Sequence, residues 1–118
     1  MPRVLAVPGR SKYHARKTTV DGLTFDSRRE ARRWVELRTL EAAGAIRDLR
    51  RQVRMELVPA FDADGKHYRA ITYTPDFVYF DVSAGRVIYE DCKGYRTDVY
   101  RLKAKLFAWR YGVSIRET

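Results

Sequence analysis

The chain has 118 residues, of which 45% are hydrophobic and 33% charged. This is enough apolar material for one packed core, and the chain is too short for two domains. With a single cysteine and no apolar run of about 20 residues, the sequence excludes an intramolecular disulfide and a transmembrane helix. The 24 Lys and Arg against 15 Asp and Glu give a net charge of +9, and most of the cations are arginines, which favours a phosphate-rich polyanion as partner.

The N-terminal stretch, residues 1–17, combines two prolines, a glycine and several basic residues with no helical or strand period. We expect a flexible basic arm there, either lying along a phosphate backbone or simply frayed, followed by a single domain over residues 18–118. The start of the chain lacks the apolar core of a signal peptide, so we expect a cytoplasmic protein that does not enter a membrane.

The first predicted elements are a short hairpin and a helix. Residues 18–25 place β-branched and aromatic residues on either side of an Asp21-Gly22 turn. A helix then begins after Ser27, a good N-cap, and ends at Gly44, which supplies a left-handed stop. Apolar residues recur at helical spacing and predict a buried stripe of Ala31, Trp34, Val35, Leu37 and Leu40.

From Ile46 the apolar period changes to two, and it predicts one half-buried strand that ends at Pro59. A turn at residues 62–65 follows, and β-forming residues then predict three strands separated by Pro75 and by a Ser-Ala-Gly turn, at 67–74, 76–82 and 86–93. We expect the last two of these strands to pair as a hairpin.

The C-terminal third predicts a second helix over residues 98–112, with Gly112 as its stop and an apolar stripe of Val99, Leu102, Leu106 and Trp109. Residues 113–117 close the chain as a short strand. The order of elements predicts an α/β domain in which a mixed central β-sheet is flanked by helices.

Two acidic residues fall at the open end of the predicted hairpin, away from its turn. With a four-residue loop after Asp81, the numbers of paired residues sum to 167, which places Asp76 opposite Asp91. Like charges that face each other destabilise a strand pair, and a hard divalent cation bound by both carboxylates removes that cost. A bulge or a shorter loop would change this pairing.

Strand alternation adds a third ionisable group to the same face. Lys93 shares a face with Asp91, whereas Glu90 and Cys92 point to the other side. A lysine beside a carboxylate-bound metal can orient or deprotonate a water that attacks a phosphorus atom. The pattern therefore predicts phosphodiester hydrolysis at Asp76, Asp91 and Lys93.

The pattern Pro75-Asp76, a gap of fourteen residues, then Asp91-Cys92-Lys93 resembles the PD-(D/E)XK nuclease motif. The segments KYHARKTTVDGLTFDSRREARRW and AGAIRDLRRQ extend the likeness over nearly the whole chain, to phage-encoded members that are similar to archaeal-type Holliday junction resolvases. This resemblance implies a restriction-endonuclease-like core. It also implies a Mg²⁺-dependent endonuclease, with Mn²⁺ as a substitute, that leaves 5′-phosphate ends and acts on four-way DNA junctions as a homodimer.

The resemblance also implies roles for individual residues. Glu30 on the first helix would complete the metal site with Asp76, Asp91 and the backbone carbonyl of Cys92, while Gln52 would line the site. A homodimer suits a four-way junction, because resolution requires two symmetric nicks and a two-fold axis supplies two matched active sites.

Basic residues close to these positions are candidates for DNA contact. They lie on the first helix and around the start of the second: Arg28, Arg29, Arg32, Arg33, Arg96, Arg101, Lys103 and Lys105. A solvated helix face, an arginine-biased composition or the surface ion pairs of a heat-adapted protein are the alternatives.

Each proposed site residue also has an ordinary structural explanation. Ser27 with Glu30 forms a capping box, Asp76 could merely begin a strand, and Asp91 with Lys93 could be a solvated ion pair. Cys92 fits a small strand residue better than a nucleophile. Two alternatives to junction resolution therefore stay open: a nuclease of this superfamily acting on other duplex or branched DNA in restriction, repair or transposition, and a noncatalytic nucleic-acid-binding protein.

Overall fold

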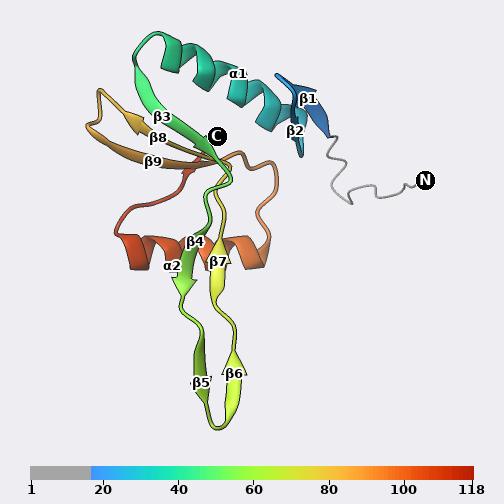
Figure 1. Ribbon diagram of the computed structural model, residues 1–118, viewed down its shortest axis with the longest axis vertical. Helices are drawn as coiled ribbons and strands as arrows, with labels where there is room; N and C mark the ends of the chain where they lie inside the picture. The colour runs from blue at the N-terminus through green and yellow to red at the C-terminus, as the bar shows by residue number, and fades with distance from the viewer. Residues whose placement is uncertain (1–16) are drawn as a thin grey trace, which may run out of the picture.

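A computed structural model describes residues 17–118, so the predicted basic arm lies outside the described residues apart from Lys17. Within these residues, two helices and ten strands follow one another in the order β1, β2, α1, β3 to β9, α2 and β10 (Figure 1). The mixed α/β class predicted from the sequence is confirmed. None of the helices in this part of the chain combines the length and apolarity needed to cross a membrane.

The N-terminal hairpin pairs β1 (Thr18–Val20) with β2 (Leu23–Phe25) as predicted. Asp21 and Gly22 both adopt positive φ, at 54° and 74°, as a two-residue type I′ turn requires. Helix α1 (Arg28–Ala42) follows, with Ser27 as N-cap and Gly44 left-handed at φ 81°.

The buried face of α1 is narrower than predicted. It consists of Glu30, Ala31, Trp34 and Leu37, whereas Val35 is 47% exposed and Leu40 37% exposed. The helix covers a single sheet, so only one side of it meets the core. Val35 and Leu40 lie outside that side and face away from the core.

The central sheet has the strand order β10-β9-β8-β3. Strand β8 (Phe77–Asp81) pairs antiparallel with both β3 (Ile46–Arg51) and β9 (Arg86–Asp91), whereas β10 (Arg116–Glu117) lies parallel to β9. Helix α1 packs on one face of this sheet, and α2 lies beyond the opposite face (Figure 1). The predicted mixed sheet between helices is therefore present.

The predicted strand from Ile46 to Pro59 is wrong as a single element. It divides into β3 and β4 (Met55–Val58), which belong to different sheets. Asp48 has a φ of 57° within a register shift of β3, and Gln52 has a φ of 58° between the two strands. These left-handed residues turn the chain out of the sheet, which an alternating pattern of side chains cannot reveal.

The predicted strand at 67–74 likewise divides, into β6 (Lys66–Tyr68) and β7 (Ile71–Tyr73). Strand β7 pairs with β4, and β6 pairs with β5 (Phe61–Ala63) around a turn in which Asp64 and Gly65 have positive φ. The two ladders form an arm that extends away from the central sheet, with the β5–β6 hairpin at its far end (Figure 1).

Helix α2 (Asp98–Tyr111) has the predicted bounds and the predicted stop at Gly112, with Thr97 as its N-cap. Its predicted buried stripe is wrong for Val99, Leu102 and Trp109, which are 63%, 59% and 76% exposed, whereas Leu106 packs against the core as predicted. The helix instead buries Tyr100 and Phe107, which pack against Tyr73 and Leu57 of the arm. Trp34, also predicted to lie in the core, is buried between α1 and the sheet.

Candidate active site

The β8–β9 hairpin has the predicted register. Phe77 pairs with Glu90 and Asp81 with Arg86, so Asp76, just before β8, comes level with Asp91 at the end of β9. Asp91 raises the pKa of Asp76 both as a hydrogen-bonding group and as a negative charge, so the two carboxyl groups are neighbours. The two acids therefore converge as the sequence predicted.

Asp91 is buried and Asp76 is half-buried, and both accept hydrogen bonds from protein groups. Asp91 is only 3% exposed and accepts a hydrogen bond from the Tyr73 hydroxyl. The Cys92 backbone N–H donates to Asp76 Oδ2 at 2.9 Å. Burial, and then the hydrogen bond and negative charge of Asp91, raise the pKa of Asp76 to about 9.

Lys93 lies on the same side as Asp91, as strand alternation predicted. Its Nζ is 3.4 Å from Asp91 Oδ2 and 4.3 Å from the centre of the Tyr100 ring. The aromatic face and the carboxylate together hold the ammonium group beside the acid pair. One positive charge thus faces two carboxyl groups, and the site keeps an excess of negative charge once both are ionised.

Glu30 approaches the acid pair from the first turn of α1. Its carboxyl group hydrogen-bonds with Asp76 and accepts from the Asp26 backbone N–H at 3.3 Å, while its own N–H donates to Ser27 Oγ at 3.1 Å. Burial of the side chain raises its pKa. Glu30 therefore fits both the structural and the functional interpretation, because it belongs to the cap of α1 and also contacts the predicted site.

The acidic groups fit a magnesium ion only in part. In residues 17–118, no three His, Cys, Asp or Glu side chains are grouped as a complete metal site. Mg²⁺ commonly takes one or two protein carboxylates and completes its shell with water and phosphate oxygens. Two neighbouring carboxyl groups, Asp91 buried and Asp76 half-buried, match that requirement, because a cation bound between them offsets their mutual repulsion.

Gln52 and several of the predicted DNA-contacting cations have other surroundings. Gln52 is exposed at the bend after β3, and the described residues offer it no hydrogen bond to the acids. Arg96 is paired with Glu117, Nε to Oε1 at 2.7 Å. The remaining exposed cations that lack an acidic partner in the described part of the chain are Arg28, Arg29, Arg32, Arg101 and Lys105, with Lys103 half-buried.

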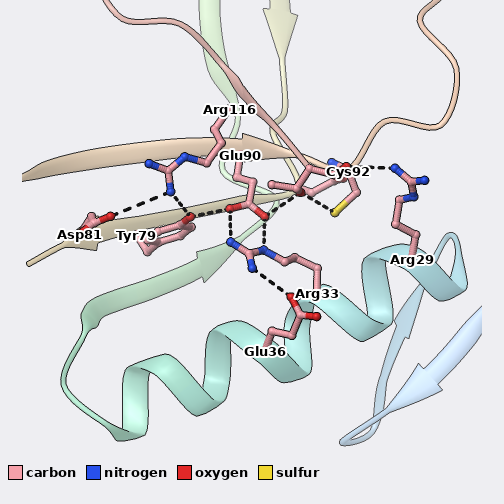
Figure 2. Close-up of polar contacts among 10 residues, drawn as sticks. Arg29, Arg33, Glu36, Tyr79, Asp81, Glu90, Cys92 and Arg116 are labelled. Atoms are coloured by element: carbon pink, nitrogen blue, oxygen red, sulfur yellow. Dashed lines mark hydrogen bonds and ion pairs between the residues drawn. The ribbon is translucent and has the colours of Figure 1, made fainter. Parts of the chain in front are cut away.

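Arg33 is engaged in a separate ion network on the other face of β9. Its guanidinium donates to both carboxylate oxygens of Glu90, at 2.6 and 3.1 Å, and to Glu36 at 3.0 Å (Figure 2). Tyr79 and Thr118 hydroxyls also donate to Glu90, which is fully buried. Arg33 is thus a structural partner of Glu90, and its predicted role in DNA contact is not favoured.

Two residues near the acids were not expected from the sequence. Tyr73 donates to Asp91. The positive charge of Arg51, at the end of β3, lowers the pKa of Glu30 and so opposes the larger effect of burial. The Arg51 guanidinium is 4.3 Å from the centre of the Phe25 ring, with Nε buried and without a hydrogen-bond partner among the described residues. Both come from segments whose strand boundaries were wrong, so no periodic pattern could have placed them.

Residues 10–117 match the family described as Protein of unknown function (DUF1064), and the chain therefore belongs to this family. Comparison with curated proteins and with solved structures gave no match.

Proposed function

We propose that the chain is a Mg²⁺-dependent DNA endonuclease with a restriction-endonuclease-like core and Asp76, Asp91 and Lys93 as its active site. The observation that carries the proposal is the neighbouring pair of half-buried Asp76 and buried Asp91, with Lys93 Nζ 3.4 Å from Asp91 Oδ2. Its place at the end of a β-hairpin agrees with the PD-(D/E)XK pattern. The net charge of +9 supports a polyanionic substrate.

The residues around the pair have distinct parts in this chemistry. Asp76 and Asp91 would hold the cation together with the Cys92 carbonyl, while Glu30 orients Asp76 and Tyr73 orients Asp91. The bound Mg²⁺ supplies neutralisation of charge on the phosphate oxygens and a water of lowered pKa. Lys93 positions the attacking water through its ammonium hydrogens and offsets charge as the phosphorus–O3′ bond breaks, which leaves a 5′-phosphate and a 3′-hydroxyl.

The leading substrate in this proposal is a four-way DNA junction, cut by a homodimer in the cytoplasm. The support is the resemblance to junction resolvases together with the two-fold symmetry of the substrate. A nuclease for other branched or linear DNA uses the same acids and differs only in the surfaces that select the substrate. Mn²⁺ would substitute for Mg²⁺, since both are bound by carboxylate oxygens.

Cleavage of labelled four-way junction and matched linear duplex, with Mg²⁺, Mn²⁺ or a chelator, tests the proposal. We expect metal-dependent symmetric nicking of the junction, loss of cleavage in Asp76→Asn, and retained cleavage in Asp81→Asn at the opposite end of β8. Equal cutting of junction and linear duplex would reject the resolvase assignment. Binding of DNA without metal-dependent cleavage of any substrate would leave a noncatalytic nucleic-acid-binding protein.

A further inference from the structure

A basic cavity lies behind the acid pair, on the α1 side of the β8–β9 hairpin. It has a volume of about 230 Å³ and is lined by Arg29, Arg32, Arg33, Glu36, Cys92 and Thr118. A water occupies about 30 Å³ in the liquid, so the cavity has room for a tetrahedral anion and some of its hydration. Figure 2 shows several of these residues around Cys92.

The arginines of this cavity are not equally neutralised. Arg33 donates hydrogen bonds to Glu90 and Glu36, whose carboxylates balance its charge. Arg29 donates to the Lys93 carbonyl oxygen and to the main-chain oxygen of Thr118, the last residue of the sequence, at 3.0 and 3.2 Å, and has no Asp or Glu partner in residues 17–118. Arg32 is exposed and has no side-chain partner within residues 17–118.

The clustering of these charges calls for an anion. Arg29 stands three and four residues before Arg32 and Arg33, so all three guanidinium groups rise from one face of α1. Like charges at these spacings repel, and Glu36, the one acidic side chain among the described residues that line the cavity, already accepts from Arg33. A phosphate group, which guanidinium groups bind through paired hydrogen bonds, would relieve this repulsion.

The cavity shares one chain segment with the acid pair. Cys92 lines the cavity, and its backbone N–H bonds to Asp76. Arg29 binds the carbonyl of Lys93, whose ammonium group faces Asp91 on the opposite side. A group bound in the cavity is therefore separated from the acids only by the thickness of the segment 91–93.

We propose that this cavity is a phosphate-binding site, with Arg29 and Arg32 as its ligands, that holds a nucleic-acid phosphate next to the one being cleaved. The choice of a nucleic-acid phosphate rests on the proposed function, whereas the binding of a phosphate anion does not. The phosphate is either an internal diester of the strand or a terminal monoester.

The test compares Arg32→Gln with Arg86→Gln in the full chain, in chelator so that no cleavage occurs. Arg86 is an exposed arginine at the far end of β9, about 17 Å from Asp91 at the usual rise per residue. Binding is measured by fluorescence anisotropy between 50 and 200 mM salt, with duplexes that carry either a 5′-phosphate or a 5′-hydroxyl. Because Arg32 is exposed and unpaired within the described part, its variant should fold normally.

We expect Arg32→Gln to weaken binding and to reduce the slope of log K against log salt by about 0.9, the contribution of one phosphate contact, beyond any change in Arg86→Gln. A loss seen only with the 5′-phosphate duplex identifies a terminal monoester, and a loss with both duplexes identifies an internal diester. Equal slopes for the two variants would overturn the proposal.

Titration with pyrophosphate separates this proposal from the nuclease assignment. Pyrophosphate should shift the NMR Nε–Hε signals of Arg29 and Arg32 and leave that of Arg86 unchanged. If those signals shift but no DNA is cut with Mg²⁺, the site stands and the proposed function fails. If junction DNA is cut while the signals and the salt slope stay unchanged, the proposed function stands and this site fails.

Discussion

Two neighbouring residues of β9, Glu90 and Asp91, carry buried carboxyl groups that point to opposite faces of the sheet, with opposite consequences. Glu90 is fully buried and meets a cation through two hydrogen bonds from Arg33, with hydroxyl donors besides. Asp91 is 3% exposed and faces a second carboxyl group, with Lys93 as the nearest cation. Burial alone does not mark a functional acid. What distinguishes Asp91 is that the described residues leave its negative charge incompletely balanced.

The largest expected effect comes from Asp91→Asn, which removes one charge of the unbalanced pair. Cleavage of junction DNA should fall by roughly three orders of magnitude or more, a loss at least as large as that of one preorganised electrostatic contact. The thermal midpoint of the metal-free protein should not fall, because the amide still bonds to Asp76. Single-turnover cleavage and a thermal melt measure the two quantities, and a variant that cuts normally would contradict the assignment.

Glu90→Gln should have the opposite effects, a loss of stability with cleavage largely retained. Removing one partner of a buried ion pair leaves the other uncompensated and costs about 3–5 kcal/mol of unfolding free energy. Arg33 keeps Glu36 as a partner, so the loss should fall toward the lower end of that range. Urea denaturation measures the loss, and the folded fraction should still cleave DNA. A cleavage defect as large as that of Asp91→Asn would erase the distinction between the two carboxyl groups.

The pH dependence of stability should also separate the two sides of β9. The pKa of Asp76 is raised to about 9 in the folded chain from an ordinary value of 3.8. The folded state therefore holds more protons than the unfolded state between these values, so the stabilisation from the proton on Asp76 is complete below about pH 4 and is lost as the pH rises through 9.

In chelator, the free energy of unfolding should fall between pH 5 and pH 9 by at least about 1.4 kcal/mol, the equivalent of one pKa unit. Mg²⁺ should restore stability at the alkaline end, where the ionised carboxylates bind it. Asp76→Asn should flatten both dependences, and denaturation at four pH values provides the measurement. A metal-free protein whose stability rises over this range would show that the pKa of Asp76 is not raised in the folded chain.

The smallest expected effect is that of Tyr73→Phe, which removes a hydroxyl donor from Asp91 and keeps the ring packed against Phe107. Loss of the donor leaves the buried carboxyl group without one of its hydrogen bonds, so activity should drop by about tenfold or less, near 1.4 kcal/mol. The matched control, Tyr79→Phe, removes a donor from Glu90 and should leave single-turnover cleavage by the folded protein unchanged. A purely structural role for Tyr73 would lower stability and leave the cleavage rate unchanged.

The sequence predicted the acid site more accurately than the surrounding packing. The register of the β8–β9 hairpin follows from its four-residue loop, and it brings Asp76 and Asp91 together as expected. The predicted stripe on α2 was wrong because Val99 and Trp109 lie on a side of the helix that faces away from the core. A helix with apolar residues on more than one side leaves open which side the neighbouring strands will cover.

By itself the sequence determined the local features: the two Asp-Gly turns, the caps of α1 and the left-handed stop of α2, and the alternation that separates Glu90 from Asp91. These depend on dihedral preferences and spacing within a few residues. Only the tertiary structure decided that Arg33 neutralises Glu90, while Arg29 and Arg32 have no Asp or Glu partner in the described part of the chain and lie beside a cavity. The physical reason is that neutralisation of a charge depends on which distant side chains the packing of α1 on the sheet brings within hydrogen-bonding distance.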